Sequence, residues 1–241
     1  MKLKKIFYWL DPFTYLDLFL EKIFGKPKNT LIKTIYWIFY ILFSFILAYL
    51  IYSIIGIILR VSMPLAIVVS TSMTPTLNKG DVVIITAPEN LNVPIITIND
   101  NIKEKDLFEI FSLEYEKNEF GLEEIKSIST NDLNLNISDA IKNKNSVIVY
   151  KSNTTPKDII HRAIVYIKAN DGEYIITKGD NNKTNRYIDQ DCGIDRNISS
   201  STEIYVSKGC LHLYPTPVES IIGKKIGKIP YIGYIKLIFT S

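Results

Sequence analysis

The feature that most constrains this chain is an uncharged apolar run from Ile35 to Leu59. As an α-helix this run of about 25 residues rises ~37 Å, enough to cross a ~30 Å hydrocarbon core with some tilt. Tyr36 and Trp37 stand at one end and Arg60 closes the other, which is typical of side chains at a membrane interface. A cleavable leader is disfavoured, because its apolar part would be shorter and closer to the N-terminus. We therefore predict one transmembrane helix over residues 34–60.

The segment before this helix, residues 1–33, is basic and interleaved with aromatic side chains. Pro12 and three carboxylates argue against a second span, since an aspartate at mid-bilayer costs roughly 2.5–3.5 kcal/mol. The pattern favours an amphipathic helix at the membrane surface, with a structureless cytoplasmic tail as the alternative. Its lysine excess predicts a single-pass protein of the cell membrane with a cytoplasmic N-terminus. Everything after Arg60 is then extracytoplasmic, or on the equivalent lumenal side.

The outer part of the chain is expected to be mostly β. Short runs rich in Val, Ile and Tyr alternate with Gly, Asn, Asp and Pro, which are strand and turn signals. Asn170-Asp171-Gly172 predicts a hairpin turn. We expect strands at Leu65–Val69, Val82–Thr86, Ser146–Lys151, Ile159–Lys168, Glu173–Lys178 and Glu203–Val206. Residues 61–87 and 146–241 would together form one extracytoplasmic domain.

Residues 88–145 interrupt this pattern and are interpreted as an insertion into the β domain. They are rich in Asn, Glu, Lys and Ile. A short strand at Ile95–Ile98 and a helix around Leu107–Glu116 are expected, within either a small cap or a mobile loop. No residue in the insertion has a catalytic pattern.

Two further features of the outer part leave alternatives open. Residues 222–239 are basic and then apolar, too short to span a bilayer. They would either dock on the membrane surface or pack as a final core strand. Cys192 and Cys210 would be able to pair in an oxidising compartment, or remain two small hydrophobic side chains.

Candidate chemistry is found in three separate places. The stretch Ser70–Gly80 reads Ser-Thr-Ser-Met-Thr-Pro-Thr-Leu-Asn-Lys-Gly and begins about ten residues after the apolar run. A serine hydroxyl becomes a good nucleophile only when a neighbouring base takes its proton. His161 lies in a strand-like stretch that would hold it rigidly, whereas His212 has no comparable surroundings. Downstream, Asp180 and Asp189 offer a carboxylate to orient the imidazole, as in a Ser-His-Asp system.

These three places resemble the motifs of the type I signal peptidases, membrane-bound serine proteases that remove signal peptides from exported proteins. The resemblance rests on Ser70–Gly80, on Ile-His-Arg at 160–162 and on Lys-Gly-Asp-Asn-Asn at 178–182. Bacterial members use a lysine base where this chain has His161, so the likeness is to the archaeal and endoplasmic-reticulum branch. It covers roughly residues 35–86 and 145–234. It implies a mainly β catalytic domain of the signal peptidase type, preceded by one transmembrane α-helix.

The resemblance also implies roles for individual residues. Ser72 would be the nucleophile and His161 the general base. Ser70 and the backbone N–H of Ser72 would form the oxyanion hole, the role of Ser70 being carried over from the bacterial enzymes. Two departures from the family pattern are Thr71, where glycine is usual, and Asn145-Ser146, where Gly-Asp is expected.

The acid is less directly assigned, because the family has two relevant aspartates about six residues apart. Asp180 matches the first, but Arg186 stands where the second is expected. The nearest acids are Asp189 and Asp191. An insertion of about three residues before them would bring Asp189 into place. We therefore predict that Asp189 is the partner of His161, with Asp180 in support.

The function implied is cleavage of N-terminal signal peptides from secreted precursors by a membrane-anchored serine endopeptidase. The expected partners are signal peptides, the lipid bilayer and the export machinery, with no metal or organic cofactor. A net charge of only +3 gives no reason to expect nucleic acid. One alternative is a non-catalytic, membrane-anchored β module that binds export substrates or partners. Another is a self-processing protease of the related Ser-Lys group, against which the apolar span and His161 both count.

Overall fold

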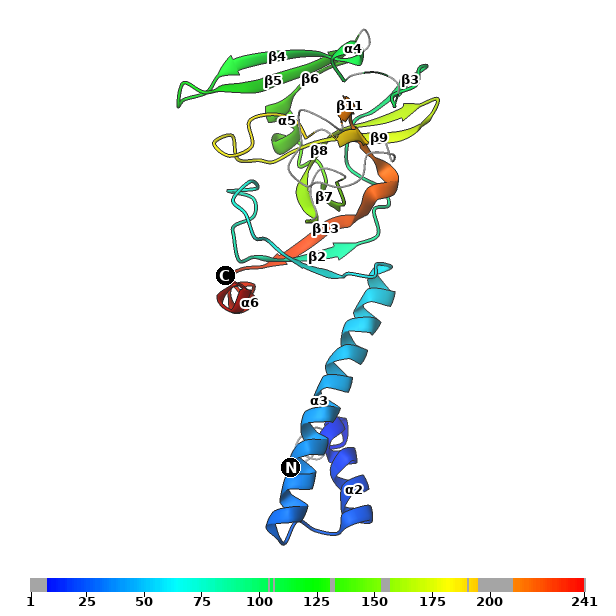
Figure 1. Cartoon of the computed structure of the whole chain (residues 1–241), viewed down its shortest axis with the longest axis vertical. Helices are drawn as coiled ribbons and strands as arrows, with labels where there is room; N and C mark the ends of the chain where they lie inside the picture. The colour runs from blue at the N-terminus through cyan, green and yellow to red at the C-terminus, as the bar shows by residue number, and fades with distance from the viewer. Residues whose placement is uncertain are drawn as a thin grey trace. The chain divides into compact units, whose positions relative to one another are not determined.

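The computed structural model describes residues 8–103, 105, 107–130, 133–152, 157–189, 191–194 and 210–240. The chain divides into two compact units, Met1–Ile58 and Leu59–Ser241. The first unit is helical and the second is mainly β (Figure 1). This confirms the coarse prediction of a mainly β domain preceded by one apolar helix.

Among its described residues the first unit contains the helices α2 (Pro12–Phe24) and α3 (Thr30–Leu59). Asp11 caps α2 by accepting the Phe13 N–H at 3.0 Å, and Pro12 occupies the first turn, where its missing N–H costs nothing. The two helices contact each other through aromatic rings, for example Phe13 against Phe43. Within the described residues, α3 is the one helix long and apolar enough to cross a membrane, with a mean hydropathy of 2.5. It starts a few residues earlier than predicted.

The second unit is built on a curled eight-stranded sheet in the order β1-β2-β13-β7-β8-β9-β12, with β3 paired to β8. The neighbours along that order are antiparallel, whereas β3 runs parallel to β8. The strands are β1 (Leu65–Ile67), β2 (Val82–Thr86), β3 (Ile95–Ile98), β7 (Val147–Tyr150), β8 (Ile159–Ala169), β9 (Gly172–Lys178), β12 (Thr216–Pro217) and β13 (Ile221–Ile229). The 3₁₀ turn η1 (Val218–Ser220) joins the last two.

The sheet reproduces most of the strands expected from the apolar runs. β7 has four consecutive buried residues, which is the pattern of a strand covered on both faces. The predicted turn at 170–172 joins β8 to β9. The expected strand Glu203–Val206 lies outside the described residues.

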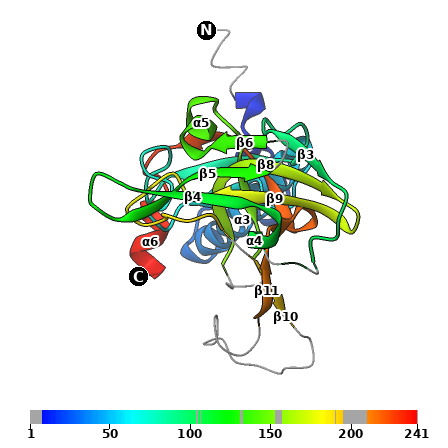
Figure 2. The same cartoon turned by 90° about the horizontal axis from the view of Figure 1, so that it is seen from above.

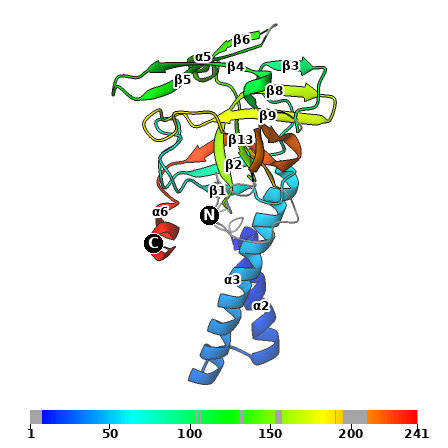
Figure 3. The same cartoon turned by 45° about the horizontal axis from the view of Figure 1, so that its top comes forward.

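The stretch 88–145 is folded and contributes to two sheets. The expected strand β3 is present and pairs with β8 of the main sheet, a pairing that was not predicted, while β4 (Ser112–Lys117), β5 (Glu123–Thr130) and β6 (Leu133–Asn136) form a separate antiparallel sheet. Helix α5 (Ile137–Lys142) follows this inserted sheet. Apolar side chains of β5 and α5 share one buried cluster with side chains of β8 and β9, so the inserted sheet packs against those strands (Figures 2 and 3).

The helix predicted around Leu107–Glu116 is wrong beyond its first turn. Helix α4 covers only Leu107–Ile110, and β4 begins at Ser112. The reason is the pattern Ser-Leu-Glu-Tyr-Glu-Lys, in which apolar and polar residues alternate with the strand period of two. Pairing with β5 then satisfies the backbone groups of this segment.

The C-terminal segment forms a strand of the main sheet, one of the two alternatives left open by the sequence, and then a short helix; docking on the membrane surface stays a prediction. Its basic half is β13, which lies between β2 and β7 in the main sheet. Its apolar half is the short helix α6 (Tyr234–Thr240), where Ile235 and Ile238 are exposed. A two-stranded sheet, β10 (Asp191–Ile194) with β11 (Cys210–Tyr214), precedes β12. Its register sets Cys192 opposite Leu213 and Cys210 opposite Ile194. The side chains of both cysteines lie outside the described residues.

Asp81, at the start of β2, is expected to stabilise the second unit in a pH-dependent way. Its side chain is 1% exposed, and Oδ2 accepts the Asn78 N–H at 3.0 Å and the Lys228 ammonium at 2.9 Å. Burial alone would raise the pKa of Asp81, but these two donors together lower it below the ordinary aspartate value. Asp81→Asn should lower the free energy of unfolding by about 1.5–3 kcal/mol near neutral pH.

Because the folded-state pKa is the lower one, this contribution is present above the unfolded pKa and is lost as pH falls through the folded value. The difference between wild type and Asp81→Asn should therefore shrink as the pH falls below the ordinary aspartate value of about 3.9. Thermal unfolding of the full chain in detergent, followed by the β signal in circular dichroism, measures this difference in stability. Tryptophan fluorescence would not, since Trp9 and Trp37 both lie in the first unit. Exposed Asp158→Asn is the control, and an equal loss at both pH values would contradict the assignment.

Candidate active site

The turn that carries Ser72 is anchored by the apolar residues of its own stretch. Met73 and Leu77 are buried in a cluster with Val83 and Ile85 of β2. The Leu77 N–H bonds to the Met73 carbonyl at 2.8 Å, which closes the turn directly after the serine. Ser72 itself stays partly exposed. The pattern of one serine followed by buried methionine and leucine therefore fixes the backbone while leaving the hydroxyl accessible.

Strand β8 brings His161 to that hydroxyl. His161 is 7% exposed and lies opposite Ile148 of β7 in the sheet register. Its Nε2 is 2.9 Å from Ser72 Oγ, and its Nδ1 is 2.5 Å from Asp189 Oδ2. Three residues that lie 89 and 28 positions apart in the chain thus form one hydrogen-bonded line, serine to imidazole to carboxylate. This is the geometry by which an imidazole activates a serine and a carboxylate orients the imidazole.

Asp189 is held by two further hydroxyls that the sequence reasoning did not single out. Oδ2 accepts from Thr177 Oγ1 at 2.8 Å and from Tyr150 Oη at 3.1 Å. Burial, and then the neighbouring Asp189 carboxylate, raise the pKa of the Tyr150 phenol well above its usual value, so it remains a hydrogen-bond donor. Thr177 directly precedes the Lys-Gly-Asp-Asn-Asn motif, and Tyr150 carried no local signal beyond ending an apolar strand.

Asp180 pairs with Arg162 rather than with His161, so any support that it gives to the site would act through Arg162 and Thr76. Its carboxylate receives Arg162 Nε at 2.8 Å and Nη2 at 2.6 Å, and the Thr76 hydroxyl at 2.5 Å. The reason is strand alternation: His161 and Arg162 are consecutive in β8 and point to opposite faces. Asp189 therefore pairs with His161 on one face of β8, and Asp180 pairs with Arg162 on the other face. Asp180 thereby ties the Ser72 turn, through Thr76, to β8.

The polypeptide that follows β9, residues 179–189, also holds the serine turn directly. Asn181 donates its backbone N–H to the Ser72 carbonyl and its side-chain amide to the Thr71 carbonyl, both at 2.8 Å. Gly179 lies so close that an added Cβ would be 2.6 Å from the Ser72 carbonyl oxygen. We call residues 179–189 the acid loop, because it also carries Asp180 and Asp189.

Ser70 is exposed, and its Oγ lies 3.1 Å from Ser72 Oγ.

Thr71 and Asn145, which depart from the signal peptidase motifs, both take part in hydrogen bonds near the site. The Thr71 carbonyl accepts from Asn181, and the buried Asn145 donates its side-chain amide to the Ala163 carbonyl at 3.0 Å. The Asn145 carbonyl also accepts from Arg162 Nη1 at 2.7 Å. Asn145 thus supports the Arg162 face of β8.

The other candidates are accounted for as follows. Lys178 is buried, but its amine donates to the Gly179 carbonyl at 2.9 Å and to Asn182 Oδ1 at 2.7 Å, on the face of β9 opposite Thr177. Ser72 Oγ therefore has an imidazole beside it, and the amine of this buried lysine is directed elsewhere. The side chains of Asp191 and His212 lie outside the described residues.

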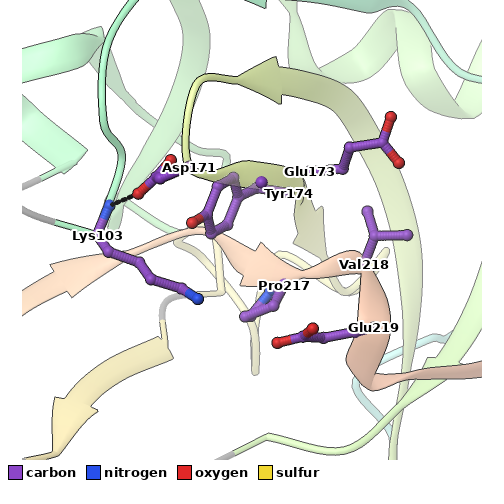
Figure 4. A pocket seen from close by; sticks show the side chains of 8 residues that line it. Lys103, Asp171, Glu173, Tyr174, Pro217, Val218 and Glu219 are labelled. Carbon is purple, nitrogen blue, oxygen red and sulfur yellow. Dashed lines mark hydrogen bonds between the residues drawn. The ribbon is translucent and has the colours of Figure 1, made fainter.

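A separate pocket of about 320 Å³ lies at the other end of β9 (Figure 4). It is lined by residues of the β8–β9 turn and of β12 and η1, among them Asp171, Tyr174 and Glu219. The Asp171 carboxylate there accepts the backbone N–H groups of Ile102 and Lys103. None of the four residues Ser72, His161, Asp180 and Asp189 lines it.

A comparison with models of known protein families finds none that matches this chain, and a search of curated proteins finds no match either.

Proposed function

We propose that this chain is a membrane-anchored serine endopeptidase that cleaves signal peptides from secreted precursor proteins, with Ser72 as nucleophile and His161 as general base. The observation that carries the proposal is the hydrogen-bonded line from Ser72 Oγ through His161 to Asp189, at 2.9 and 2.5 Å. The motif resemblance supplies the substrate class. A non-catalytic binding module has no need of such a line, because binding requires neither an activated hydroxyl nor an oriented imidazole.

The geometry supports the following reaction. His161 Nε2 accepts the proton of Ser72 Oγ as the oxygen attacks the scissile carbonyl, and Asp189 stabilises the resulting imidazolium through Nδ1. Ser70 Oγ, 3.1 Å from the nucleophile, and the Ser72 backbone N–H would donate to the developing oxyanion. The imidazolium then protonates the leaving amine. Water, activated by the same imidazole, hydrolyses the acyl-enzyme and releases the signal peptide.

The substrate would bind as an added strand. β1 is an outer strand of the main sheet, and the chain runs from it directly towards Ser70 and Ser72. An extended peptide that pairs with an outer strand receives main-chain hydrogen bonds, while shallow apolar pockets select small side chains at the first and third positions before the cut. With α3 in the bilayer, enzyme and signal helix would share one membrane, which raises their encounter rate. The catalytic unit would lie on the extracytoplasmic side, next to the export machinery.

The test is cleavage of a secretory precursor by the purified full chain in detergent or liposomes. We expect a mature product whose new N-terminus follows a small residue, as N-terminal sequencing would show. The matched substrate carries a bulky residue in place of that small one and should not be cut. Binding of the precursor without cleavage would instead favour the membrane-anchored binding module.

Gly179→Ala is expected to reduce cleavage strongly while leaving the fold intact. The added Cβ would be 2.6 Å from the Ser72 carbonyl oxygen, so the serine turn and the acid loop must move apart. A displacement of about 1 Å at a reacting group can cost ~10²-fold in rate. Gly227→Ala in β13 is the control, because its Cβ would meet Ile84 at an ordinary 3.4 Å. Initial cleavage rates measure the effect, and equal rates for both variants would contradict it.

A further inference from the structure

The inserted sheet is joined to the acid loop by a buried charged network. Glu124 of β5 is 8% exposed, and its Oε1 accepts from Asn182 Nδ2 at 2.9 Å. Asn182 Oδ1 in turn accepts from the ammonium of Lys178, which is 3% exposed, at 2.7 Å. The second Glu124 oxygen accepts from Asn118 Nδ2 at 2.9 Å. The Asn182 amide therefore bridges a buried carboxylate of the inserted sheet and a buried ammonium at the end of β9.

Backbone and apolar contacts follow the same path. The Ile125 N–H donates to the Arg186 carbonyl at 3.0 Å. Ile188, the residue before Asp189, is buried in one cluster with Ile125 and Ile128 of β5. The Lys183 ammonium lies 4.0 Å from the centre of the Phe120 ring, at the turn between β4 and β5. The inserted sheet therefore contacts the acid loop near its beginning, in its middle and near its end.

The other side of the same loop touches the proposed catalytic groups. Asn181, adjacent to the bridging Asn182, donates to the carbonyls of Thr71 and Ser72. At the far end, the Asp189 N–H bonds to the Thr177 carbonyl at 2.7 Å, and its carboxylate reaches His161. One loop of about ten residues therefore connects β5 to the nucleophile turn and to the imidazole.

We propose that the inserted sheet is a positioning element for the catalytic site, and that Glu124 is its principal positioning residue. Through Asn182 and Lys178, Glu124 holds the acid loop in the conformation that supports Ser72 and carries Asp189 to His161. This inference rests on the proposed function for its kinetic consequences, although the loop conformation itself is measurable without catalysis. It assigns a role to a segment in which the sequence shows no catalytic pattern.

The charge of Glu124 is part of this role. Burial lowers the pKa of the Lys178 amine, and the nearby Glu124 carboxylate opposes that effect. Removing the carboxylate leaves a buried ammonium with one fewer counter-charge, and buried polar groups that lose a partner are costly. The acid loop is the segment free to rearrange, because Lys178 itself is fixed by strand pairing with Arg162.

The test compares Glu124→Ala, Glu124→Gln and the exchange variant Asn118→Asp/Glu124→Gln with wild type. In Glu124→Gln the side chain has one oxygen for two amide donors, Asn118 Nδ2 and Asn182 Nδ2, so one hydrogen bond is lost together with the negative charge. In the exchange variant the new aspartate can accept from the new glutamine, which restores both the hydrogen bond and the negative charge. Asn118 Oδ1 accepts the backbone N–H groups of Phe120 and Leu122 at 3.0 Å, and an aspartate can do the same. Glu116→Ala is the control, since Glu116 lies in β4 of the same sheet and pairs with Lys126 on the surface.

Two readouts are taken on the folded full chain. Amide hydrogen exchange of residues 179–189, resolved by mass spectrometry, should speed up by about 10-fold or more in Glu124→Ala and return towards wild type in the exchange variant. Precursor cleavage should show kcat reduced by about 10- to 100-fold with KM nearly unchanged, and the same rescue. A merely stabilising role would lower the melting temperature but not the kcat of folded molecules.

The proposal is overturned if exchange in the acid loop is unchanged in Glu124→Ala, or if it rises while kcat per folded molecule stays at the wild-type value. It is also overturned if Glu116→Ala produces the same changes, since the effect would then be a general one of the inserted sheet's stability. Absence of cleavage by wild type would contradict the proposed protease function alone. Protection of the acid loop against hydrogen exchange, with its loss in Glu124→Ala and its return in the exchange variant, would still decide whether Glu124 holds that loop.

Discussion

Replacing Ser72 with alanine is expected to abolish precursor cleavage, with a loss in kcat of about 10⁶-fold. In serine proteases that use an imidazole base, removing either the serine or the histidine alone costs about as much as removing the whole system. Ser72 Oγ, 2.9 Å from His161 Nε2, is the proposed attacking atom, so no covalent intermediate can form without it. The measurement is single-turnover cleavage of a secretory precursor with enzyme in excess.

The matched control for this variant is Ser112→Ala, an exposed serine of β4 that takes no part in the site. It should cleave at the wild-type rate, whereas His161→Gln should lose nearly as much activity as Ser72→Ala. Residual cleavage by Ser72→Ala within about 10-fold of wild type would assign the nucleophile elsewhere.

The rate of the wild-type enzyme should also fall on acidification. An imidazolium cannot accept the serine proton, so protonation of His161 should stop the reaction. The expected profile of kcat/KM therefore declines on the acid side and levels towards alkaline pH. An identical acid limb in the residual activity of His161→Gln would show that another group causes it.

The parts of the fold that were predictable are those specified by local pattern. The charge-free run from Ile35 predicted α3, and runs of β-branched residues predicted β2, β7, β8 and β9, because burial on both faces demands such runs. The helix expected after Leu107 failed beyond one turn, because the pairing partner that turns Ser112–Lys117 into a strand lies farther along the chain. Tertiary pairing of this kind overrides local propensity.

The site was predictable to the extent that its residues belong to motifs. Ser72 and His161 were found in this way, and Asp189 by allowing for extra residues in the acid loop. Tyr150 and Thr177 were missed as partners of Asp189, since their roles depend on the sheet register that sets β7, β8 and β9 side by side. Glu124 was missed because its burial arises only when the inserted sheet packs on β8 and β9.

Asp189→Asn and Asp180→Asn are expected to fail in different ways, which separates the roles of the two acids. Asp189 accepts from His161 Nδ1, so an asparagine there would present an amide and favour the wrong imidazole tautomer. The expected loss in kcat is about 10⁴-fold, as for the corresponding change in a Ser-His-Asp site. Thr177 and Tyr150 contact the same Oδ2 as His161, so an amide NH₂ placed there would face both hydroxyls; the fold should be retained, because a hydroxyl can accept as well as donate.

Asp180 instead neutralises Arg162, and both side chains are almost fully buried, at 2% and 6% exposed. Breaking a buried pair by removing one partner costs about 3–5 kcal/mol, so Asp180→Asn should mainly lower the melting temperature. Its remaining folded fraction should keep a kcat far above that of Asp189→Asn, since the His161 line is intact. Thermal unfolding and single-turnover rates on the same preparations compare the two. If Asp180→Asn were folded and as slow as Asp189→Asn, Asp180 would have to act on the chemistry itself. The division of the acids between the two faces of β8 would then be wrong.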